Sequence, residues 1–343
     1  MIVQSFPLIE VSGTAYELGF QHGAQAAELV ERYLRWIEKL SGKPRDLLGR
    51  NALALLPAIQ ALSPAYVEEI RGLADGAKIS FEEALLCQVR AEAARLGEGG
   101  CTAFALTGSA TADGQPLAGQ NQDLEPEFAD MAILLRVKPA DGRPRALMFT
   151  FAGQLGYAGM NQSGLALFNN ALFDYTWQMG LPRQPLKRVM LEKSAVAECV
   201  ELLGRHRTCS AANVLLSDGQ GKIAGVEIRP EGVALVQEDQ PDYCLHTNHY
   251  LTDRFARFET NSIPDSIPRL AHLRTLVKEN WGQITVDTLK DILADHADGT
   301  AGICRHGATG WHSISGYIAE PAKRLLHVRR GHGCLGIWQS YEV

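Results

Sequence analysis

A cysteine directly follows two glycines in the stretch Gly99-Gly100-Cys101, where a helical pattern gives way to a strand-like one. Thiols are strong nucleophiles, and glycines allow unusual backbone angles that expose the preceding carbonyl. The Cys101 thiol is therefore placed to attack the Gly100 carbonyl in an N-to-S acyl shift. Hydrolysis of the resulting thioester would cut the Gly100–Cys101 bond.

Cleavage would give Cys101 an α-amine beside its own thiol. The amine has a reference pKa of about 7.7–8.0 and the thiol one of about 8.5, so the amine can take the thiol proton near neutral pH. One residue would then supply both nucleophile and base. The alternative is that Cys101 is a small apolar side chain at the start of a buried strand, as most unmodified cysteines are.

A site of this kind needs groups that orient the amine and stabilise a tetrahedral oxyanion. Asp123 ends the segment "AGQNQD", and a hairpin between this run and the Cys101 strand would place it near the thiol. Asn248 stands at a strand end in "CLHTNHY", and Arg305 stands in the loop "AGICRHG". These three residues are the candidates for orienter, oxyanion donor and counter-charge.

The ordered segments "GGCTAFA", "GQNQD", "GMNQSGLALFNN", "LHTNHY" and "ICRHG" resemble the acyl-coenzyme A:6-aminopenicillanic acid acyltransferase family of N-terminal-nucleophile hydrolases. The resemblance extends to the N-terminal "VSGTAYELGFQHG". It implies a four-layer αββα sandwich, self-cleavage before the cysteine, and amide hydrolysis or acyl transfer through a thioester.

The resemblance also implies roles for individual residues. It makes Cys101 the nucleophile, Asp123 the group that orients the new amine, Asn248 an oxyanion donor and Arg305 a polar support. The chain departs from the family pattern at Gln122, where an aromatic residue is frequent, and at Cys304, where a serine can precede the arginine; both departures bear on substrate preference. The resemblance adds three residues that are expected to line the pocket: Tyr157, Asn161 and Asn170.

Other chemistry is less well supported by the residue patterns. The run "HTNH" around Asn248 contains two histidines, a residue type that binds metals. A zinc site needs three or four ligands, however, and neither HExxH nor paired CxxC occurs. No metal site is predicted. A thiol-protease site could be imagined from Cys304 with His306 or His312, but it would need a fold that this sequence does not suggest. His306 is therefore expected in a polar loop at the pocket mouth. The glycine-rich "GQLGYAGMNQSG" lacks the spacing of a phosphate loop and is interpreted as a turn.

The composition limits the class of protein. The chain has 343 residues, 46% of them hydrophobic, and a net charge of −6 without basic clusters, which favours neither nucleic acid nor an anionic membrane as partner. The start lacks a signal-peptide pattern, and no run reaches the roughly 18 apolar residues of a membrane span, so a cytoplasmic location is expected. Seven widely spaced cysteines argue against a disulfide scaffold and are expected to be reduced and mostly buried.

The periodicity predicts helices first and strands afterwards. After a strand-like start at 1–11, helices are expected over 14–40, 45–62, 63–77 and 80–96, and later over 186–203, 266–280 and 286–297. The short apolar runs beyond Cys101 are typical of antiparallel strands. We therefore expect one α+β domain over 1–343, with 1–100 as a mostly helical pro-segment or small subunit and 101–343 as the large subunit.

The predicted function is a self-processing N-terminal cysteine amidase or acyltransferase that acts on linear amide C–N bonds or acyl thioesters of a small molecule. Water as acceptor would make it a hydrolase, and an amine would make it a transferase. No cofactor is expected beyond an acyl-coenzyme A as co-substrate, and the partners are the substrate and the two fragments of the chain itself. The alternative is an uncleaved, catalytically silent protein that binds a small acylated ligand.

Overall fold

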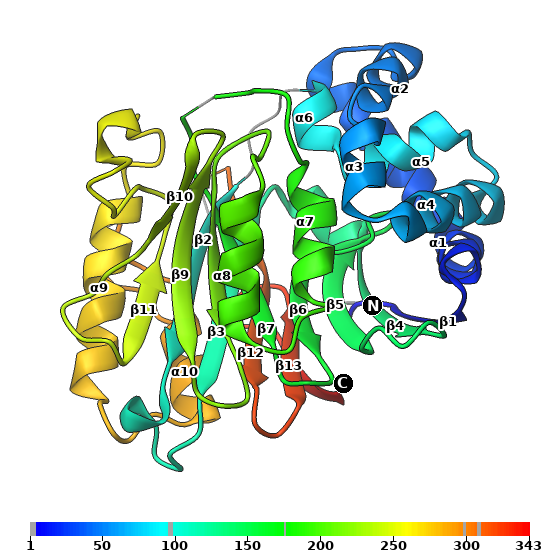
Figure 1. Ribbon diagram of the computed structural model, residues 1–343. Helices are drawn as coiled ribbons and strands as arrows, with labels where there is room; N and C mark the ends of the chain where they lie inside the picture. The colour runs from blue at the N-terminus through cyan, green and yellow to red at the C-terminus, as the bar shows by residue number, and fades with distance from the viewer. Residues whose placement is uncertain (1–4, 95–98, 175, 298–299, 307–309) are drawn as a thin grey trace.

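Two β-sheets packed face to face form the centre of the molecule (Figure 1). The computed structural model describes residues 5–94, 99–174, 176–297, 300–306 and 310–343. Within these residues the larger sheet has eight strands, in the spatial order β1 (Leu8–Gly13), β4 (Ala132–Pro139), β5 (Ala146–Phe151), β6 (Ala158–Asn161), β7 (Ala166–Ala171), β8 (Ala212–Ser217), β9 (Ile223–Arg229) and β10 (Gly232–Leu235). Neighbouring strands are antiparallel except for the parallel pair β1 and β4.

The smaller sheet carries the candidate nucleophile. Its six strands in the described part of the chain are, in spatial order, β11 (Tyr243–His246), β2 (Gly100–Leu106), β3 (Leu117–Leu124), β12 (His312–Glu320), β13 (Leu325–Arg330) and β14 (Trp338–Glu342). All of its pairings are antiparallel. Alternation along β2 places Ala103 and Ala105 in the core between the sheets, while Phe104 and Leu106 join the core on the opposite face.

Helices cover the outer faces of both sheets (Figure 1). The larger sheet is covered by α7 (Arg183–Met190) and α8 (Val196–Arg205), and the smaller sheet by α9 (Ser266–Glu279) and α10 (Val286–Leu293). Leucines of α9 and α10 pack against Phe104 and Leu106. The order helix, sheet, sheet, helix confirms the predicted αββα sandwich.

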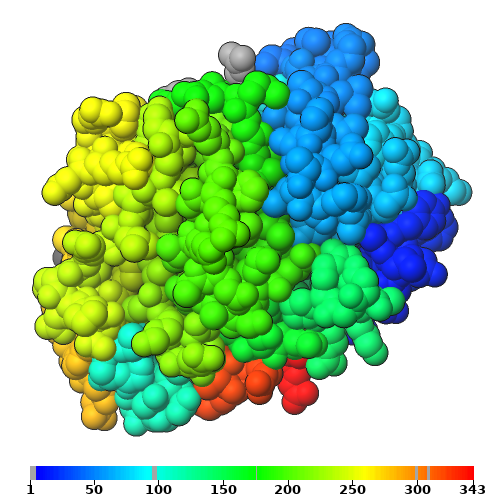
Figure 2. All heavy atoms as spheres, viewed as in Figure 1, coloured from blue at the N-terminus to red at the C-terminus, as the bar shows by residue number. Residues whose placement is uncertain are grey.

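The N-terminal part is mostly helical, as predicted. It forms a block at one end of the larger sheet, seen as continuous blue atoms in Figure 2. Its helices are α1 (Ala15–Ser41), α2 (Arg45–Leu53), α3 (Leu56–Leu62), α4 (Pro64–Ala77), α5 (Phe81–Gln88) and α6 (Arg90–Ala94). Thr14 and Ser80 begin α1 and α5 with capping boxes, in which the side chain accepts from the backbone of a glutamate three residues later.

Some predicted boundaries differ from the structure. The expected helix over 45–62 is split into α2 and α3, because Pro57 is tolerated only in the first turn of a helix. The helix expected over 80–96 is split into α5 and α6, and the one expected over 186–203 into α7 and α8. The helix expected to reach 297 ends at Leu293, and β14 was not predicted. The start of the predicted strand, 1–4, and the end of the predicted helix over 80–96 lie outside the described residues. Among the described helices, none is both long and apolar enough for a membrane span.

Candidate active site

Strands β2 and β3 are neighbours, as the predicted hairpin requires. Gly100 is paired with Asp123 and Cys101 with Gln122, while β12 places Ser313 opposite Asp123 on the other side of β3. The Ser313 hydroxyl donates a 2.6 Å hydrogen bond to Asp123 Oδ1. Asp123 is fully buried. Its carboxyl therefore lies between Gly100 and Ser313.

Close packing explains the two glycines before Cys101. Neither has a positive φ, so the unusual backbone angles suggested by the sequence are not found. A Cβ at Gly100 would overlap with Arg305 Nη1, and one at Gly99 would overlap with the Asp123 carbonyl. The Gly100 Cβ position also lies 3.5 Å from Asp123 Oδ2 and 3.6 Å from Asn248 Oδ1. All three predicted polar residues thus surround Gly100, the residue before Cys101.

Asn248 contacts the backbone nitrogen of Cys101. Two residues after the end of β11, its Oδ1 accepts a 2.8 Å hydrogen bond from the Cys101 N–H. Its Nδ2 donates to the Ala171 carbonyl at 3.1 Å. In this orientation Asn248 holds the nitrogen that would become the α-amine. Its role as an oxyanion donor, which needs Nδ2, stays a prediction.

Arg269 belongs to this network and was missed by the sequence analysis. Its fully buried guanidinium donates from Nη1 to the Cys101 carbonyl at 3.0 Å and from Nη2 to Asn248 Oδ1 at 2.9 Å. Asp265, at the start of α9, lies 3.3 Å from Arg269 and 2.5 Å from Arg305. The only sequence signal was an Asp–Arg pair four residues apart, a spacing that is equally common on exposed helix surfaces.

Arg305 is held in place by its backbone and its side chain. Its N–H donates to Ser313 Oγ at 2.9 Å, its Nη2 pairs with Asp265, and its guanidinium lies 5.7 Å from the centre of the Trp311 ring. Arg305 Nη1 lies 4.0 Å from Asp123 Oδ2, which is too far for a hydrogen bond. Both atoms are buried without a hydrogen-bond partner within the described residues, and both lie beside Gly100.

The three predicted pocket residues lie in different places. Asn170 is one residue before Ala171, and its side chain donates to the His246 carbonyl at 3.3 Å, so it supports the segment that leads to Asn248. Tyr157 is buried, with the Lys187 ammonium 4.3 Å from its ring centre.

Asn161 lies apart from this group. It ends β6 beside the start of β7, whereas Ala171 ends β7, and five strand residues span roughly 17 Å. Its side chain donates to the carbonyls of Leu191 and Lys193 and accepts from two backbone N–H groups of the following turn. Asn161 therefore organises a turn and is not brought together with Cys101.

Most of the chain is similar to known acyltransferases. The family model for acyl-coenzyme A:6-aminopenicillanic acid acyl-transferase matches residues 110–329, which include Asp123, Asn248 and Arg305. The chain belongs to this family. The 40 kDa form of the acyl-coenzyme A:6-aminopenicillanic-acid-acyltransferase of Emericella nidulans is 26% identical over 336 residues, which cover 94% of this chain and 92% of the relative. The predicted family, an acyltransferase or amidase family, is thereby confirmed.

More distant proteins also match. An uncharacterized protein of Archaeoglobus fulgidus is 22% identical over 83% of this chain and 57% of its own length. Two solved structures are each 14% identical to this chain. A mutant of the conjugated bile acid hydrolase of Clostridium perfringens has a TM-score of 0.48 over 71% of this chain and 97% of that one. The penicillin V acylase of Agrobacterium tumefaciens has a TM-score of 0.46 over 67% and 83%.

The electrostatics of this acyl-transferase family member centre on Asp123. Burial raises the pKa of the Asp123 carboxyl above its ordinary value, while the positive charges of Arg305 and Arg269 act in the opposite direction. An ammonium formed on Cys101 would add a further positive charge beside this carboxyl. The site therefore favours the pair of carboxylate and ammonium once an α-amine is present.

Replacing Arg305 with methionine is expected to move the acid limb of the kcat/KM profile to higher pH. Loss of the guanidinium removes a charge that favours the carboxylate, so the pKa of Asp123 rises and a higher pH is needed to ionise it. The kcat/KM profile reports the free enzyme. The change should cost more free energy in kcat/KM than in unfolding, since the guanidinium contacts charged groups of the site. Arg274→Met, on the same helix as Arg269 but paired with Glu238, is the matched control. If the acid limb of Arg305→Met stays at the wild-type pH, Arg305 does not influence the pKa of Asp123.

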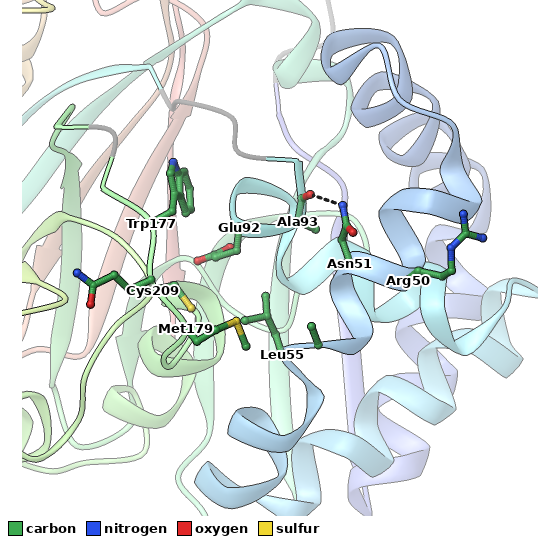
Figure 3. A pocket seen from close by; sticks show the side chains of 10 residues that line it. Arg50, Asn51, Leu55, Glu92, Ala93, Trp177, Met179 and Cys209 are labelled. Carbon is green, nitrogen blue, oxygen red and sulfur yellow. Dashed lines mark hydrogen bonds between the residues drawn. The ribbon is translucent and has the colours of Figure 1, made fainter.

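A cavity of about 370 Å³ lies between the N-terminal helices and the segment that follows β7 (Figure 3). Its walls combine apolar and charged side chains from α2, α6 and residues 177–179. Glu92 and Ala93 line it, and Asn51 donates to the Ala93 carbonyl at 3.1 Å. Cys101 does not line this cavity, and its side chain is only 2% exposed. In the continuous chain the predicted nucleophile is buried.

Proposed function

We propose that this chain is a self-processing N-terminal cysteine amidase or acyltransferase that acts on small amides or acyl thioesters through a Cys101 thioester. One observation carries the proposal. The Gly100–Cys101 peptide lies beside Asp123 Oδ2 and Arg305 Nη1, two buried atoms of opposite charge that lack hydrogen-bond partners within the described part of the chain. A new amine and a developing oxyanion are the groups that would satisfy them.

The first reaction is on the chain itself. The Cys101 sulfur bonds to the Gly100 carbonyl carbon, the C–N bond breaks, and the departing nitrogen takes up the thiol proton. Water then hydrolyses the thioester, which leaves a Gly100 carboxylate and restores the thiol. Arg305, next to Gly100, is placed to stabilise the oxyanion of the tetrahedral intermediate.

The second reaction repeats this chemistry on substrate. The α-amine of Cys101, held by Asn248 Oδ1 and facing Asp123, takes the thiol proton, and the sulfur bonds to the acyl carbon. The leaving amine or thiol departs with a proton from the ammonium. The acyl group then passes from sulfur to water or to an acceptor amine. The family supports acyl transfer, for which an acyl-coenzyme A is the proposed co-substrate.

Cleavage also explains how substrate reaches a buried thiol. Glu92 and Ala93 line the cavity of Figure 3, and α6 ends at Ala94, shortly before Gly100. Once the bond is cut, the new carboxyl end at Gly100 is no longer covalently joined to Cys101 and can move away from it. We propose that the acyl substrate then extends from this cavity to the thiol.

Intact mass measurement with a panel of amides and acyl thioesters tests the proposed function. The expected result is an acyl adduct on the fragment that begins with Cys101, which disappears with time in water and faster with an acceptor amine. Cys209→Ser, which changes a cysteine of the cavity wall, is the matched control and should keep the adduct. Ligand bound without any covalent adduct would favour the silent binding protein instead.

A further inference from the structure

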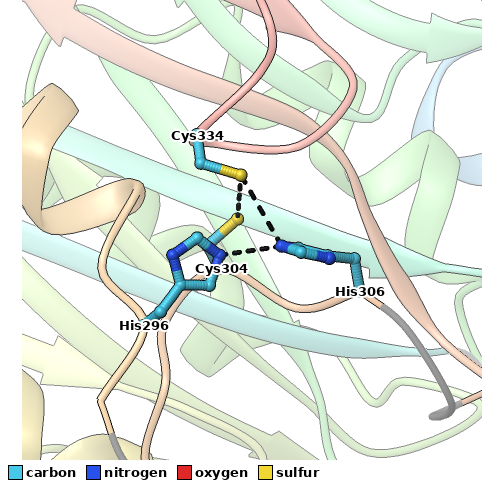
Figure 4. A group of neighbouring side chains, drawn as sticks. All are labelled: His296, Cys304, His306 and Cys334. Atoms are coloured by element: carbon cyan, nitrogen blue, oxygen red, sulfur yellow. Dashed lines mark hydrogen bonds between the residues drawn. The ribbon is translucent and has the colours of Figure 1, made fainter.

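Two histidines and two cysteines from three separate segments meet at the surface (Figure 4). His296 follows α10, Cys304 and His306 precede β12, and Cys334 lies between β13 and β14. One ligand atom from each residue lies within 4.8 Å of the other three. Cys304 is buried, and the other three residues are exposed. The proposed acyl-transfer reaction uses none of these side chains.

The distances within the cluster are close to those of a tetrahedral zinc site. Zn–S bonds of about 2.3 Å and Zn–N bonds of about 2.0–2.1 Å place two sulfurs about 3.8 Å apart, sulfur and nitrogen about 3.6 Å, and two nitrogens about 3.3 Å. The Cys304 and Cys334 sulfurs are 4.0 Å apart, and Cys334 Sγ is 3.6 Å from His306 Nε2. The Nε2 atoms of His296 and His306 are 2.8 Å apart, so these two imidazoles would move apart by about 0.5 Å on binding zinc. The other three pairs of ligand atoms lie within 4.8 Å of one another.

The ligand segments are positioned by contacts outside the cluster. The Gly333 N–H donates to Cys304 Sγ at 3.2 Å, a contact that favours a thiolate. A Cβ at Gly333 would overlap with the Leu293 carbonyl, so only glycine lets the Cys334 loop approach the end of α10 this closely. The Cys304 N–H donates to the Asp295 carbonyl at 2.9 Å. Backbone contacts thus bring all three segments together.

We propose that His296, Cys304, His306 and Cys334 bind one Zn²⁺ ion. Two thiolates and two imidazoles are ligands that zinc prefers, and four protein ligands are typical of a structural site. Binding displaces the two thiol protons to solvent and forms two Zn–S and two Zn–N bonds. The ion ties α10, the loop before β12 and the β13–β14 loop together. Arg305 stands between two of the ligands, so the ion also restrains the backbone beside the active site.

No metal site was predicted from the sequence, because the four ligands do not share a motif. Cys304 and His306 are separated by one residue, but His296 and Cys334 come from other segments, and only the fold brings them near. A disulfide between Cys304 and Cys334 is the competing arrangement. It needs a sulfur separation of about 2.05 Å, whereas these sulfurs are 4.0 Å apart.

Metal analysis of the purified full chain, loaded with Zn²⁺ and desalted, tests the site. We expect one zinc per chain in the wild type, and with Co²⁺ in its place an absorption spectrum with sulfur-to-cobalt charge transfer and tetrahedral d–d bands. Cys334→Ser and His296→Ala are exposed changes, and each should weaken zinc affinity at least tenfold while circular dichroism stays that of the wild type. His206→Ala, a histidine far from the cluster in sequence, is the matched control and should retain the metal.

Three results would overturn the proposal. These are a wild type that binds neither Zn²⁺ nor Co²⁺ under reducing conditions, variants that retain full affinity, and a mass that shows Cys304 joined to Cys334 in the native protein. Zinc lost only from Cys304→Ser would also contradict the proposal, because that buried change can disturb folding while the two exposed variants would have retained the metal. None of these measurements depends on acyl transfer, so failure of the zinc site and failure of the proposed function are distinguishable.

Discussion

Cys101→Ala is expected to stay a single uncleaved chain and to lose turnover by a factor on the order of 10⁴–10⁶, as other enzymes do when their nucleophile is removed. Alanine fits the site, because the Cys101 side chain is buried and the backbone hydrogen bonds to Asn248 and Arg269 do not involve the sulfur. The variant should therefore fold. Denaturing gels and turnover of the best acyl substrate measure the two effects.

Cys101→Ser refines the same prediction. A hydroxyl can attempt the same acyl shift but is a weaker nucleophile than a thiol, so slow cleavage over hours is expected. Cys199→Ser controls for the loss of a buried cysteine that does not line the cavity, and this variant should be cleaved and active like the wild type. A Cys101→Ala chain that is cut at Gly100–Cys101, or that turns over substrate, would remove Cys101 from both reactions.

Asn248→Ala is expected to fold and to lose about 10²–10³ in kcat, the usual cost of removing one preorganised polar group from such a site. Asn248 Oδ1 accepts hydrogen bonds from the Cys101 N–H and from Arg269 Nη2, so its loss releases the nitrogen that acts as base. Turnover by a cleaved, folded variant is the quantity to measure. Near-normal turnover would exclude Asn248 from the site.

Asn161→Ala is the matched control for this change. Asn161 is also a buried asparagine, but its hydrogen bonds hold a turn at the other end of β7. Its loss should lower the free energy of unfolding by about 1–3 kcal/mol while turnover per folded molecule stays constant.

Asn248→Asp separates two roles, because it keeps Oδ1 as acceptor and removes the Nδ2 donor. A smaller loss of kcat in Asn248→Asp than in Asn248→Ala would indicate that Asn248 orients the amine and does not donate to an oxyanion.

Local patterns were sufficient to predict most of the elements of this fold, with β14 as an exception. Apolar periodicity located the N-terminal helices, and the change to short apolar runs after Cys101 located the sheets. The hairpin that joins Cys101 and Asp123 follows from two adjacent strands and a short connection, which is local information. The layer order came from the family resemblance, since helices and strands of this kind can pack in several ways.

The rest of the site depends on contacts between distant segments. Arg269 reaches Cys101 only because α9 packs across β2. An arginine within an amphipathic helical pattern does not by itself predict such a contact. Asn161 was grouped with Asn170 because the family resemblance implied that both line the pocket, yet strand register places them at opposite ends of β7. The Cys334 loop meets Cys304 only through the pairing of β12, β13 and β14.

The central claim is that the chain cuts itself before Cys101. Intact mass measurement of the purified wild type under denaturing conditions, together with N-terminal sequencing, tests it most directly. We predict two associated fragments, 1–100 and 101–343, of which the larger begins with Cys101. A wild type that is active while its Gly100–Cys101 bond remains whole would contradict the claim. The base would then have to be another group, since without cleavage Cys101 has no α-amine.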